Sequence, residues 1–470
     1  MVVGELTQEV DLLVIGAGPG GYVAALAAAD AGMATTLVEE AKVPGGVCLR
    51  EGCIPSKALL HVAKTIADAE DAAAFGVSYP KPEMDIGKLR GWKNGVIRRL
   101  STGVKQLLAG RKVDYLKGRA EFESSKIVRV EGDEPVRMKF RHCIIATGSR
   151  PKLLPEAVLP RALCWDAADA LQVEAVPDRL LVVGGGYIGL EIGQVYAALG
   201  SEVTVVEALD GILNGLDPEL AKPLVARLRK QMKAIHTGAE LKGVAKKGSA
   251  LEVVFTAGGR ERKEAFDRIL VSVGRRPNSE SLGLQKTKVA VDENGFIRVD
   301  AQRRTADRHI FAIGDVAGNP MLAHKAMREA IVAVDAIGGK PAVFDPACIP
   351  SVVYTDPEVA WCGVTEAEAK ARELDHQVTR FPWVASGRAV SMGRTDGLTK
   401  MIFDKATQRL LGVGIVGVHA GDLIAEGVLA MEMAAVAEDI SASIHPHPAT
   451  NETLAEAAGA MFGRAVHGAH

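Results

Sequence analysis

Two glycine-rich turns, each framed by an apolar strand and an apolar helix, most constrain how this chain can fold. The first lies in VDLLVIGAGPGGYVAALAAADAG, where Gly16, Gly18 and Gly21 fit the spacing GxGxxG. A second strand, TTLVEE, follows and ends at Glu39. In a Rossmann unit the first glycine makes the turn, the second lets a pyrophosphate approach the backbone, and the third lets helix and strand pack closely. The segment predicts a dinucleotide-binding unit, with Glu39 placed to accept hydrogen bonds from a ribose.

The same pattern recurs in RLLVVGGGYIGLEIGQVYAALGSEVTVVE, with Gly184, Gly186 and Gly189 at the turn and Glu207 at the end of the second strand. Two complete patterns predict two dinucleotides bound in separate Rossmann-like domains. An acid at the position of Glu207 favours a free 2′-hydroxyl, whereas a 2′-phosphate would need nearby arginines, and the following ALDGILNGL contains none. We therefore expect NAD rather than NADP at the second site.

The chain of 470 residues is longer than a single hydrophobic core usually grows, so several domains are expected. IIATGSRP (144–151) and ILVSVGRRPN (269–278) are apolar strands broken by Gly and Pro, and they predict crossings out of the first domain and back into it. HIFAIGDVAG predicts another strand, ending on Asp315, whose carboxylate is placed to bind a cofactor hydroxyl. From about Asp345 the pattern alternates as in strands and then gives way to long Ala-rich amphipathic helices, which indicates a separate α+β domain.

Composition indicates a soluble α/β enzyme and excludes other classes. Apolar residues make up 48% and charged residues 24% of the chain, close to the globular average. A formal net charge of −2 without long charged runs predicts neither a nucleic-acid partner nor an anionic membrane surface. The N-terminus lacks a basic stretch before its apolar segment, and no apolar run is long enough to span a bilayer. We therefore expect a cytoplasmic protein.

Two of the six cysteines, Cys48 and Cys53, stand close together in GGVCLREGCIPSK. The other four are scattered among apolar neighbours and are interpreted as small buried hydrophobes: Cys143, Cys164, Cys348 and Cys362. A zinc site would need two more ligands, yet His61 stands alone, so no metal is expected. In a reducing compartment a redox pair fits better than a structural disulfide.

The residues after Cys53 support redox chemistry. Pro55 stands where a helix is predicted to start, and good helix formers follow it. A thiolate at a helix N-terminus is stabilised by the helix dipole and by free backbone N–H groups. Lys57, one turn further on, adds a positive charge that could support the thiolate or a flavin, or could simply be a solvated helix lysine.

The chain as a whole resembles the pyridine nucleotide–disulfide oxidoreductases that carry FAD, and within them the dihydrolipoamide dehydrogenase branch. The segments that carry the resemblance are GAGPGGYVAA, GGVCLREGCIPSKALLH, ATGSRP, GGGYIGLE, VGRRPN, AIGDVAG with PMLAHKA, YTDPEVA and HPHPATNE. The resemblance implies an α/β fold with two Rossmann-like domains, for FAD and NAD, and a C-terminal α+β dimerisation domain. The predicted division is 1–149 and 278–344 for the FAD-binding domain, 150–277 for the NAD-binding domain and 345–470 for the dimerisation domain.

The resemblance also assigns roles to particular residues. Lys57 is implied to lie near the flavin ring and to pair with Glu191 of GGGYIGLE, while Asp315 is implied to meet the ribityl chain. The residues implied to bind FAD are Gly16, Gly18, Gly21, Glu39, Lys57, Gly118, Asp315 and Ala323. Those implied to bind NAD or to lie at the flavin edge are Gly184, Gly186, Gly189, Glu191, Glu207 and Gly274.

Near the end of the chain, IHPHPATNE matches the family's catalytic base at His447 and its orienting carboxylate at Glu452. A histidine can take a thiol proton at neutral pH, and a hydrogen-bonded carboxylate fixes its tautomer. Read alone, HPHP is only a loop with two histidines, of which His445 is interpreted as structural.

The implied activity is oxidation of protein-bound dihydrolipoamide to lipoamide, through a disulfide of Cys48 and Cys53 and FAD, with reduction of NAD⁺. Cys48 would face the substrate and Cys53 the flavin. The implied partners are a second copy of the chain, which would supply His447 to the site, and a lipoyl domain of an acyltransferase or a glycine cleavage carrier protein.

Five positions depart from the family's usual residues: Val47 stands for Thr, Arg50 and Glu51 stand for Asn-Val, and Ala449 and Thr450 stand for Thr-Leu. Because the spacing is kept, we expect the chemistry to be retained, with an effect on substrate preference and on the potential of the disulfide. Two alternatives remain open. One is another disulfide reductase of the family, such as a glutathione-type enzyme, because Tyr187 in the second turn resembles the tyrosine that covers the flavin in those enzymes. The other is a non-catalytic FAD-binding redox sensor.

Overall fold

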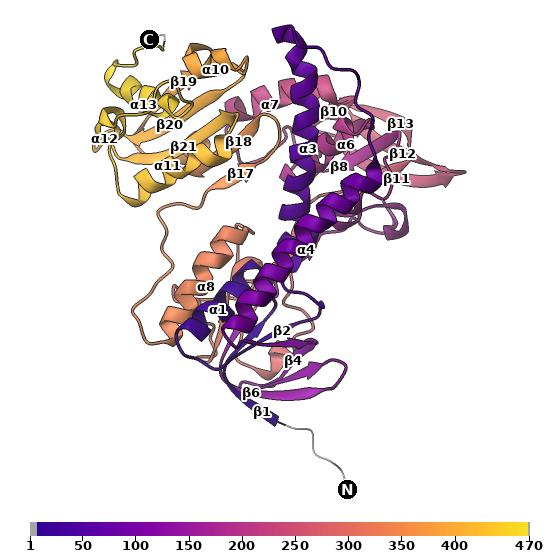
Figure 1. Ribbon diagram of the computed structural model, residues 1–470, viewed down its shortest axis with the longest axis vertical. Helices are drawn as coiled ribbons and strands as arrows, with labels where there is room; N and C mark the ends of the chain where they lie inside the picture. Colours follow the sequence, from indigo (N-terminus) through magenta and orange to yellow (C-terminus); the bar gives the residue numbers. More distant parts are fainter. Residues whose placement is uncertain (1–6, 469–470) are drawn as a thin grey trace.

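The computed structural model describes residues 7–468, and three groups of strands and helices make up its architecture (Figure 1). The first group is built on a seven-stranded sheet in the order β3-β2-β1-β6-β5-β4, with β16 pairing on β6. The strands around the first glycine turn run parallel, and β4, β5 and β6 are antiparallel. The strands of this sheet are β1 (Thr7–Ile15), β2 (Thr35–Glu39), β3 (Asp114–Lys117), β4 (Arg119–Ser124), β5 (Ile127–Glu131), β6 (Val136–Ile145) and β16 (Ile310–Ala312).

Helices cover this sheet because its central strands are apolar on both faces. Leu12, Leu13 and Val14 of β1 are fully buried, and their side chains pack alternately into two core clusters. The helices of this part are α1 (Pro19–Asp30), α2 (Gly46–Glu51), α3 (Cys53–Asp71), α4 (Ile86–Gly110) and α8 (Ala323–Ile337). Residues 310–337 thus join the first sheet although they follow the second unit in sequence.

The second unit repeats the parallel arrangement in a four-stranded sheet, β10-β9-β8-β14, beside a three-stranded antiparallel sheet, β11-β12-β13. The elements of this unit are α5 (Ala167–Gln172), β8 (Arg179–Val183), α6 (Tyr187–Ala198), β9 (Glu202–Val206), α7 (Pro218–Gln231), β10 (Ala234–His236), β11 (Glu240–Lys247), β12 (Ala250–Ala257), β13 (Arg260–Phe266) and β14 (Arg268–Val271). The chain enters and leaves through two short strands, β7 (Ser149–Pro151) and β15 (Arg275–Pro277), which pair with each other in antiparallel fashion.

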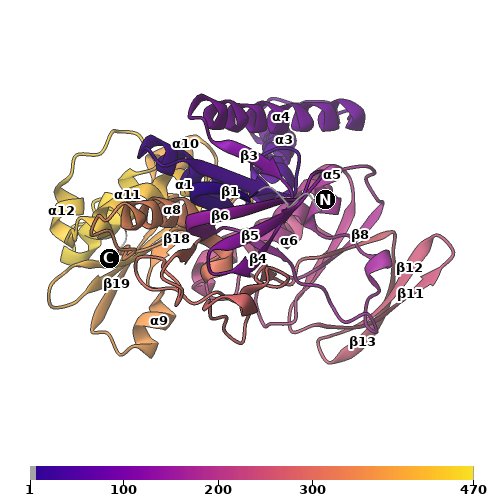
Figure 2. The ribbon, with the colours of Figure 1, turned by 90° about the horizontal axis from the view of Figure 1, so that it is seen from below.

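The C-terminal part is an antiparallel five-stranded sheet, β17-β18-β21-β20-β19, with helices against it. Figure 2 and Figure 1 both show it on the opposite side of the molecule from β11–β13. Its elements are β17 (Ser351–Val353), β18 (Glu358–Gly363), α9 (Glu366–Ala371), β19 (His376–Pro382), α10 (Gly387–Ser391), β20 (Leu398–Asp404), β21 (Leu410–Gly417), α11 (Ala420–Glu432), α12 (Ala437–Ala442) and α13 (Glu452–Gly459).

Helix α3 connects the three parts. In Figure 1 it stands between the C-terminal sheet and the second unit. Leu59 and Leu60 of α3 belong to one core cluster with Leu190 of α6 and with Val353 and Val359 of the C-terminal sheet. The helix that begins at the cysteine pair is therefore held by residues from both other parts of the protein.

Three details differ from the sequence predictions. Helix α3 begins at Cys53 rather than at Pro55, because a proline within the first turn removes no helical hydrogen bond. Strand β16 ends at Ala312, and Asp315 lies in a short 3₁₀ turn that follows, with Gly314 in the left-handed region. The final helices are not long: α11 has 13 residues, and α12 and α13 have 6 and 8, separated by the HPHP loop.

Of the remaining predictions, the mixed α/β fold with its C-terminal α+β part is observed, and the four scattered cysteines are buried and free. The division of the chain at particular residue numbers stays a prediction. Between residues 7 and 468, none of the helices combines the length and the apolar character needed to cross a bilayer.

Candidate active site

A disulfide between Cys48 and Cys53 lies in the wall of a large cavity. Cys48 belongs to α2 and Cys53 is the first residue of α3, and their Cα atoms are 4.7 Å apart. Both line a cavity of about 740 Å³ that also reaches the first glycine turn and Glu39. This volume lies within the range of small-molecule and cofactor sites in proteins. The structure therefore places the cysteine pair and the first glycine turn in the lining of one cavity.

The first glycine turn is shaped for a close ligand. Gly16 has φ +100°, and a Cβ there would lie 2.4 Å from the carbonyl oxygen of Ala146. A Cβ on Gly21 would lie 1.7 Å from the oxygen of Gly16, so helix α1 can approach the strand only with glycine at this position. Gly18, in contrast, faces free space apart from the Cα of Gly46 at 4.0 Å. A pyrophosphate fits this opening at the N-terminus of α1, and a side chain would fill it.

Most residues that were predicted to bind FAD share this cavity. Those in its lining are Gly16, Gly18, Glu39, Lys57, Gly118, Asp315 and Ala323, and Cys48, Cys53 and Glu191 line it as well. Gly21 acts through packing behind the turn. Tyr187 of the second glycine turn also lines the cavity, whereas the three glycines of that turn, Glu207, Gly274, His447 and Glu452 do not.

Lys57 and Glu191 form an ion pair at the edge of the cavity. The Nζ atom of Lys57 donates to Glu191 Oε2 at 2.8 Å, and the side chain of Glu191 is only 3% exposed. The same oxygen accepts the hydroxyl of Ser56 at 2.8 Å, and Oε1 accepts the backbone N–H of Tyr354 at 3.0 Å. The ammonium group also lies 4.6 Å from the centre of the Tyr354 ring. A buried carboxylate with this many donors is held in one orientation.

Sequence reasoning missed the partners of Asp315. The hydroxyl of Ser149 donates to Asp315 Oδ2 at 2.5 Å, and Nε of Arg275 donates to the Ser149 hydroxyl at 2.7 Å. Ser149 and Arg275 lie in the paired strands β7 and β15, at the two chain crossings. Their signal was present in the motifs GSRP and GRRP, but only the pairing of these strands brings them to Asp315.

The second glycine turn forms a separate site with the same geometry as the first. Gly184 has φ +110°, a Cβ on Gly189 would lie 2.3 Å from the oxygen of Gly184, and Gly186 has nothing within 4 Å. Glu207 accepts the backbone N–H of Gly185 at 2.6 Å and that of Leu209 at 2.8 Å. Gly274, also with positive φ, follows β14 at the end of the same sheet. The residues present fit a second dinucleotide.

His447 and Glu452 form a hydrogen-bonded pair in the C-terminal part. The Nδ1 atom of His447 lies 2.8 Å from Glu452 Oε1, and the histidine side chain is 75% exposed. Burial raises the pKa of Glu452, but hydrogen bonds from the Ala449 N–H and from His447 outweigh it, and the pKa is lowered. The ring is thus oriented with its other nitrogen free for an external group. His445 instead bonds Glu426 at 2.6 Å.

Three of the five residues that depart from the family pattern lie at the disulfide. Val47, Arg50 and Glu51 all line the main cavity. Arg50 donates from Nε to the oxygen of Gly46 at 3.3 Å, and its guanidinium lies 3.7 Å from Glu51. Residues 7–468 contain no cluster of three or more His, Cys, Asp or Glu side chains able to hold a metal ion.

Comparisons with known proteins agree with this arrangement. The family described as "Pyridine nucleotide-disulphide oxidoreductase" matches residues 10–330, and its dimerisation domain matches residues 349–458. The chain is 47% identical to the dihydrolipoyl dehydrogenase of Thermus scotoductus, over 97% of this chain and 98% of the relative. It is 42% identical to that of Bacillus subtilis, over 99% of both chains.

Among solved structures, the chain is similar to the Cu(II) complex of the HOCl-induced flavoprotein disulfide reductase RclA from Escherichia coli. The TM-score is 0.86 at 27% identity, and the match covers 96% of this chain and 99% of the other.

Proposed function

The chain belongs to the pyridine nucleotide-disulphide oxidoreductase family, and from that premise we propose how its residues divide the oxidation of dihydrolipoamide among them. It is an NAD-dependent flavoprotein disulfide oxidoreductase, similar over nearly its full length to dihydrolipoyl dehydrogenases. The reaction converts dihydrolipoamide and NAD⁺ into lipoamide, NADH and a proton. The observation that carries this function is the Cys48–Cys53 disulfide in the wall of a dinucleotide-sized cavity.

We assign FAD to the main cavity. Its pyrophosphate would lie against Gly16, Gly18 and the N-terminus of α1, its adenosine ribose near Glu39, and its ribityl chain near Asp315. Gly118 and Ala323, which line the same cavity, would contact it as well. When bound, FAD accepts two electrons from a dithiol and transfers a hydride to NAD⁺.

We assign NAD to the second turn. Gly184, Gly186 and Gly189 would bind its pyrophosphate, with Glu207 nearby on the ribose side. Gly274 would lie at the edge of this cofactor. Support for NAD over NADP comes from the acid at position 207 and from the absence of arginine in the segment 208–216.

The exchange of thiols runs through the two cysteines in turn. One thiolate of dihydrolipoamide attacks the Sγ atom of Cys48 and displaces Cys53 as a thiolate. The second substrate thiolate then attacks its partner sulfur in the mixed disulfide, releasing lipoamide and the Cys48 thiolate. Cys53, at the N-terminus of α3, is stabilised as a thiolate by the backbone N–H groups of the first helical turn.

Lys57 and Glu191 form an ion pair in the lining of the same cavity as the two cysteines. Glu191 anchors the ammonium group at 2.8 Å, and the backbone N–H of Tyr354 and the Ser56 hydroxyl keep the carboxylate in place. A cation held at this position stabilises negative charge that develops nearby, at no cost in reorganisation.

His447 removes the protons of the substrate thiols. Its Nδ1 is held by Glu452, so Nε2 is the nitrogen that accepts the proton. Because His447 does not line the cavity of its own chain, we propose that it serves the Cys48 of a second copy, through the dimerisation domain of residues 349–458. The active unit is then a homodimer.

The physiological reductant in this proposal is a lipoyl group on an acyltransferase or on a glycine cleavage carrier protein. Such a group is a flexible arm that delivers a dithiol to a second protein. We also propose a cytoplasmic location, which fits four cysteines that stay reduced in the structure.

The deciding experiment is steady-state turnover of the purified holoprotein with dihydrolipoamide and either NAD⁺ or NADP⁺. We expect rapid NADH formation and a strong preference for NAD⁺. Cys48→Ser should retain FAD and lose this turnover. A preference for NADPH with oxidised glutathione would instead identify a glutathione-type reductase, and a wild-type protein that binds FAD without turning over either thiol would be a redox sensor.

A further inference from the structure

The segment Tyr354–Pro357 lies directly behind the Lys57–Glu191 pair. Its first residue supplies the backbone N–H that Glu191 Oε1 accepts at 3.0 Å, and the Tyr354 ring lies beneath the Lys57 ammonium. The position of the Glu191 carboxylate therefore depends on where this segment runs.

One turn further along α6, Gln194 holds the same segment at a second point. Its Oε1 accepts the N–H of Asp356 at 2.8 Å, and its Nε2 donates to the carbonyl oxygen of Asp356 at 3.1 Å. Residues three apart on a helix share a face, so Glu191 and Gln194 hold the segment from one side of α6. Gln231, at the end of α7, fixes the Gln194 amide in turn at 2.7 Å.

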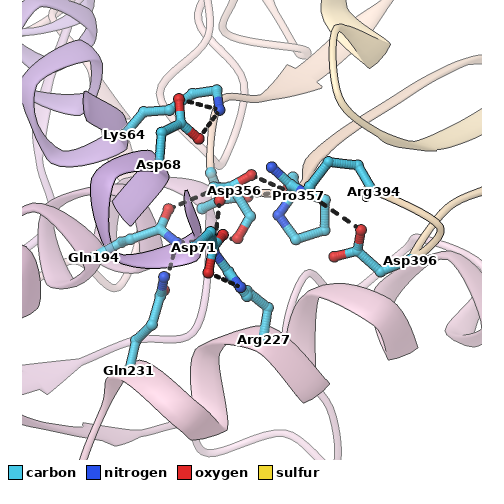
Figure 3. Close-up of polar contacts among 11 residues, drawn as sticks. Lys64, Asp68, Asp71, Gln194, Arg227, Gln231, Asp356, Pro357, Arg394 and Asp396 are labelled. Atoms are coloured by element: carbon cyan, nitrogen blue, oxygen red, sulfur yellow. Dashed lines mark hydrogen bonds and ion pairs between the residues drawn. The ribbon is translucent and has the colours of Figure 1, made fainter. Parts of the chain in front are cut away.

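The side chain of Asp356 links this segment to two arginines, Arg394 and Arg227. Asp356 is 8% exposed, and its Oδ1 accepts Arg394 at 2.5 Å while Oδ2 lies 3.4 Å from Arg227. Arg227 also bonds Asp71, the last residue of α3 (Figure 3). A carboxylate between two guanidinium groups that are 12% and 19% exposed is costly to remove, because both cations then lose a buried partner.

These contacts connect the two ends of α3 to one segment, Tyr354–Pro357. At its start the helix carries Lys57, which bonds Glu191, which bonds Tyr354. At its end it carries Asp71, which bonds Arg227, which bonds Asp356 in the same segment. Lys57 and Asp71 are separated by about 21 Å of helix. We call Asp71, Gln194, Arg227, Asp356 and Arg394 the Asp356 brace.

We propose that Asp356 is a positioning residue for the Lys57–Glu191 pair, and through it for the flavin side of the thiol pair. The inference rests on the proposed function, in which Lys57 lies at the flavin. Asp356 itself touches neither the cysteines nor the main cavity, since it lines a different cavity of about 670 Å³ with Gln194 and Tyr354.

The test compares Asp356→Asn with a matched control, Asp396→Asn, in the FAD-loaded enzyme. Asp396 bonds the same Arg394 at 3.3 Å, and among residues 7–468 it forms no hydrogen bond or ion pair with Tyr354, Gln194 or Arg227. Its loss therefore leaves the contacts of the Asp356 brace in place. We expect Asp356→Asn to lower kcat about tenfold with less than a twofold change in KM for dihydrolipoamide, and to shift the visible absorption of the flavin after NADH reduction. Asp396→Asn should do neither, and Asp356→Glu should restore most of kcat.

A double-mutant cycle separates positioning from general loosening of the fold. If Asp356 acts through the pair, Asp356→Asn placed on top of Lys57→Met should lower kcat by less than a further twofold. An equal tenfold loss in both backgrounds, or a lower melting temperature with an unchanged flavin spectrum, would overturn the proposal. NADH-driven flavin reduction is followed in parallel, because it reports on the pair even if dihydrolipoamide proves not to be the substrate.

Discussion

Glu39 and Glu207 occupy equivalent places in the two dinucleotide units. Each carboxylate accepts one N–H from the residue after the first glycine of its turn and one from the residue two positions further along its own segment. The distances are 2.8 and 3.2 Å at Glu39 and 2.6 and 2.8 Å at Glu207. The acid at the end of the second strand therefore fixes the shape of the glycine turn, in addition to any contact with a ribose.

This equivalence predicts that removing either acid affects only its own cofactor. Glu207→Ala leaves the buried N–H of Gly185 without its acceptor, which costs about 1–3 kcal/mol, whereas the exposed N–H of Leu209 can bond water. We expect KM for NAD⁺ to rise at least tenfold with normal FAD content. Glu39→Ala is the reciprocal variant and should lose FAD on gel filtration. Equal FAD loss in both variants would contradict the assignment of the two units.

A second prediction concerns which chain supplies His447. Cys48→Ser and His447→Gln variants should each be nearly inactive, since a general base contributes about 10²- to 10⁴-fold. When the two are unfolded and refolded together, half of the dimers pair one chain of each kind. Each such dimer contains one intact site if His447 acts across the interface, so roughly a quarter of wild-type activity should return. No recovery in the mixture would show that His447 serves its own chain.

The charge pair inside the disulfide loop predicts opposite effects on redox potential. Glu51→Val leaves Arg50 without its partner at 3.7 Å, and a free cation beside the sulfurs favours the thiolates and hence the reduced form. We expect its potential to rise by about 10–30 mV, and that of Arg50→Asn to fall by a similar amount. The double variant should lie near the wild type. Potentials are measured by equilibration with glutathione or NADH, and shifts of the same sign in both single variants would contradict this account.

A buried lysine joins the second unit to the C-terminal sheet and predicts how acid weakens the protein. Lys400 on β20 is 2% exposed at its side chain and contacts Asp217 at 2.8 Å, Glu366 at 2.7 Å, and Glu219. Hydrogen bonds from Lys370 and Lys400 lower the pKa of Glu366 to about 2. A carboxyl group whose pKa is lowered by folding stabilises the folded state above its unfolded value near 4.5, and this stabilisation is lost as pH falls toward 2.

We therefore expect the free energy of unfolding to fall steeply between pH 4.5 and pH 2. Lys400→Met should destabilise the protein by about 3–5 kcal/mol at neutral pH, because the buried Asp217 loses its cation and Glu219 and Glu366 each lose one of theirs. Its stability should also depend less on pH in this range. Lys405→Met, at a lysine 62% exposed, is the control and should behave as the wild type. Urea unfolding of the wild type, Lys400→Met and Lys405→Met at several pH values tests these expectations.

The parts of this protein that sequence reasoning predicted are those encoded locally or by motif. Both glycine turns were predicted from spacing because the requirement for glycine is steric and acts within one turn. The Cys48–Cys53 and Lys57–Glu191 contacts followed from family resemblance. The end of β16 was misplaced, since Gly314 turns the backbone before Asp315 and an apolar run does not show where a strand stops.

The Asp356 brace could not have been predicted in this way. Gln194 and Asp356 are 162 positions apart, and Asp71 and Arg227 are 156 apart. No local pattern marks such pairs, because their contact depends on how three parts of the chain pack around α3. The same holds for Ser149 and Arg275, which meet Asp315 only after two distant strands pair.

That pairing of β7 with β15 has a consequence for the history of the molecule. The second unit, to which we assign NAD, lies between two neighbouring strands, so its two ends meet where it joins the rest of the chain. An inserted domain with adjacent ends closes its host's loop at little entropic cost and leaves the host's sheet intact. Such a unit can be replaced during evolution without a break in the sheet of its host.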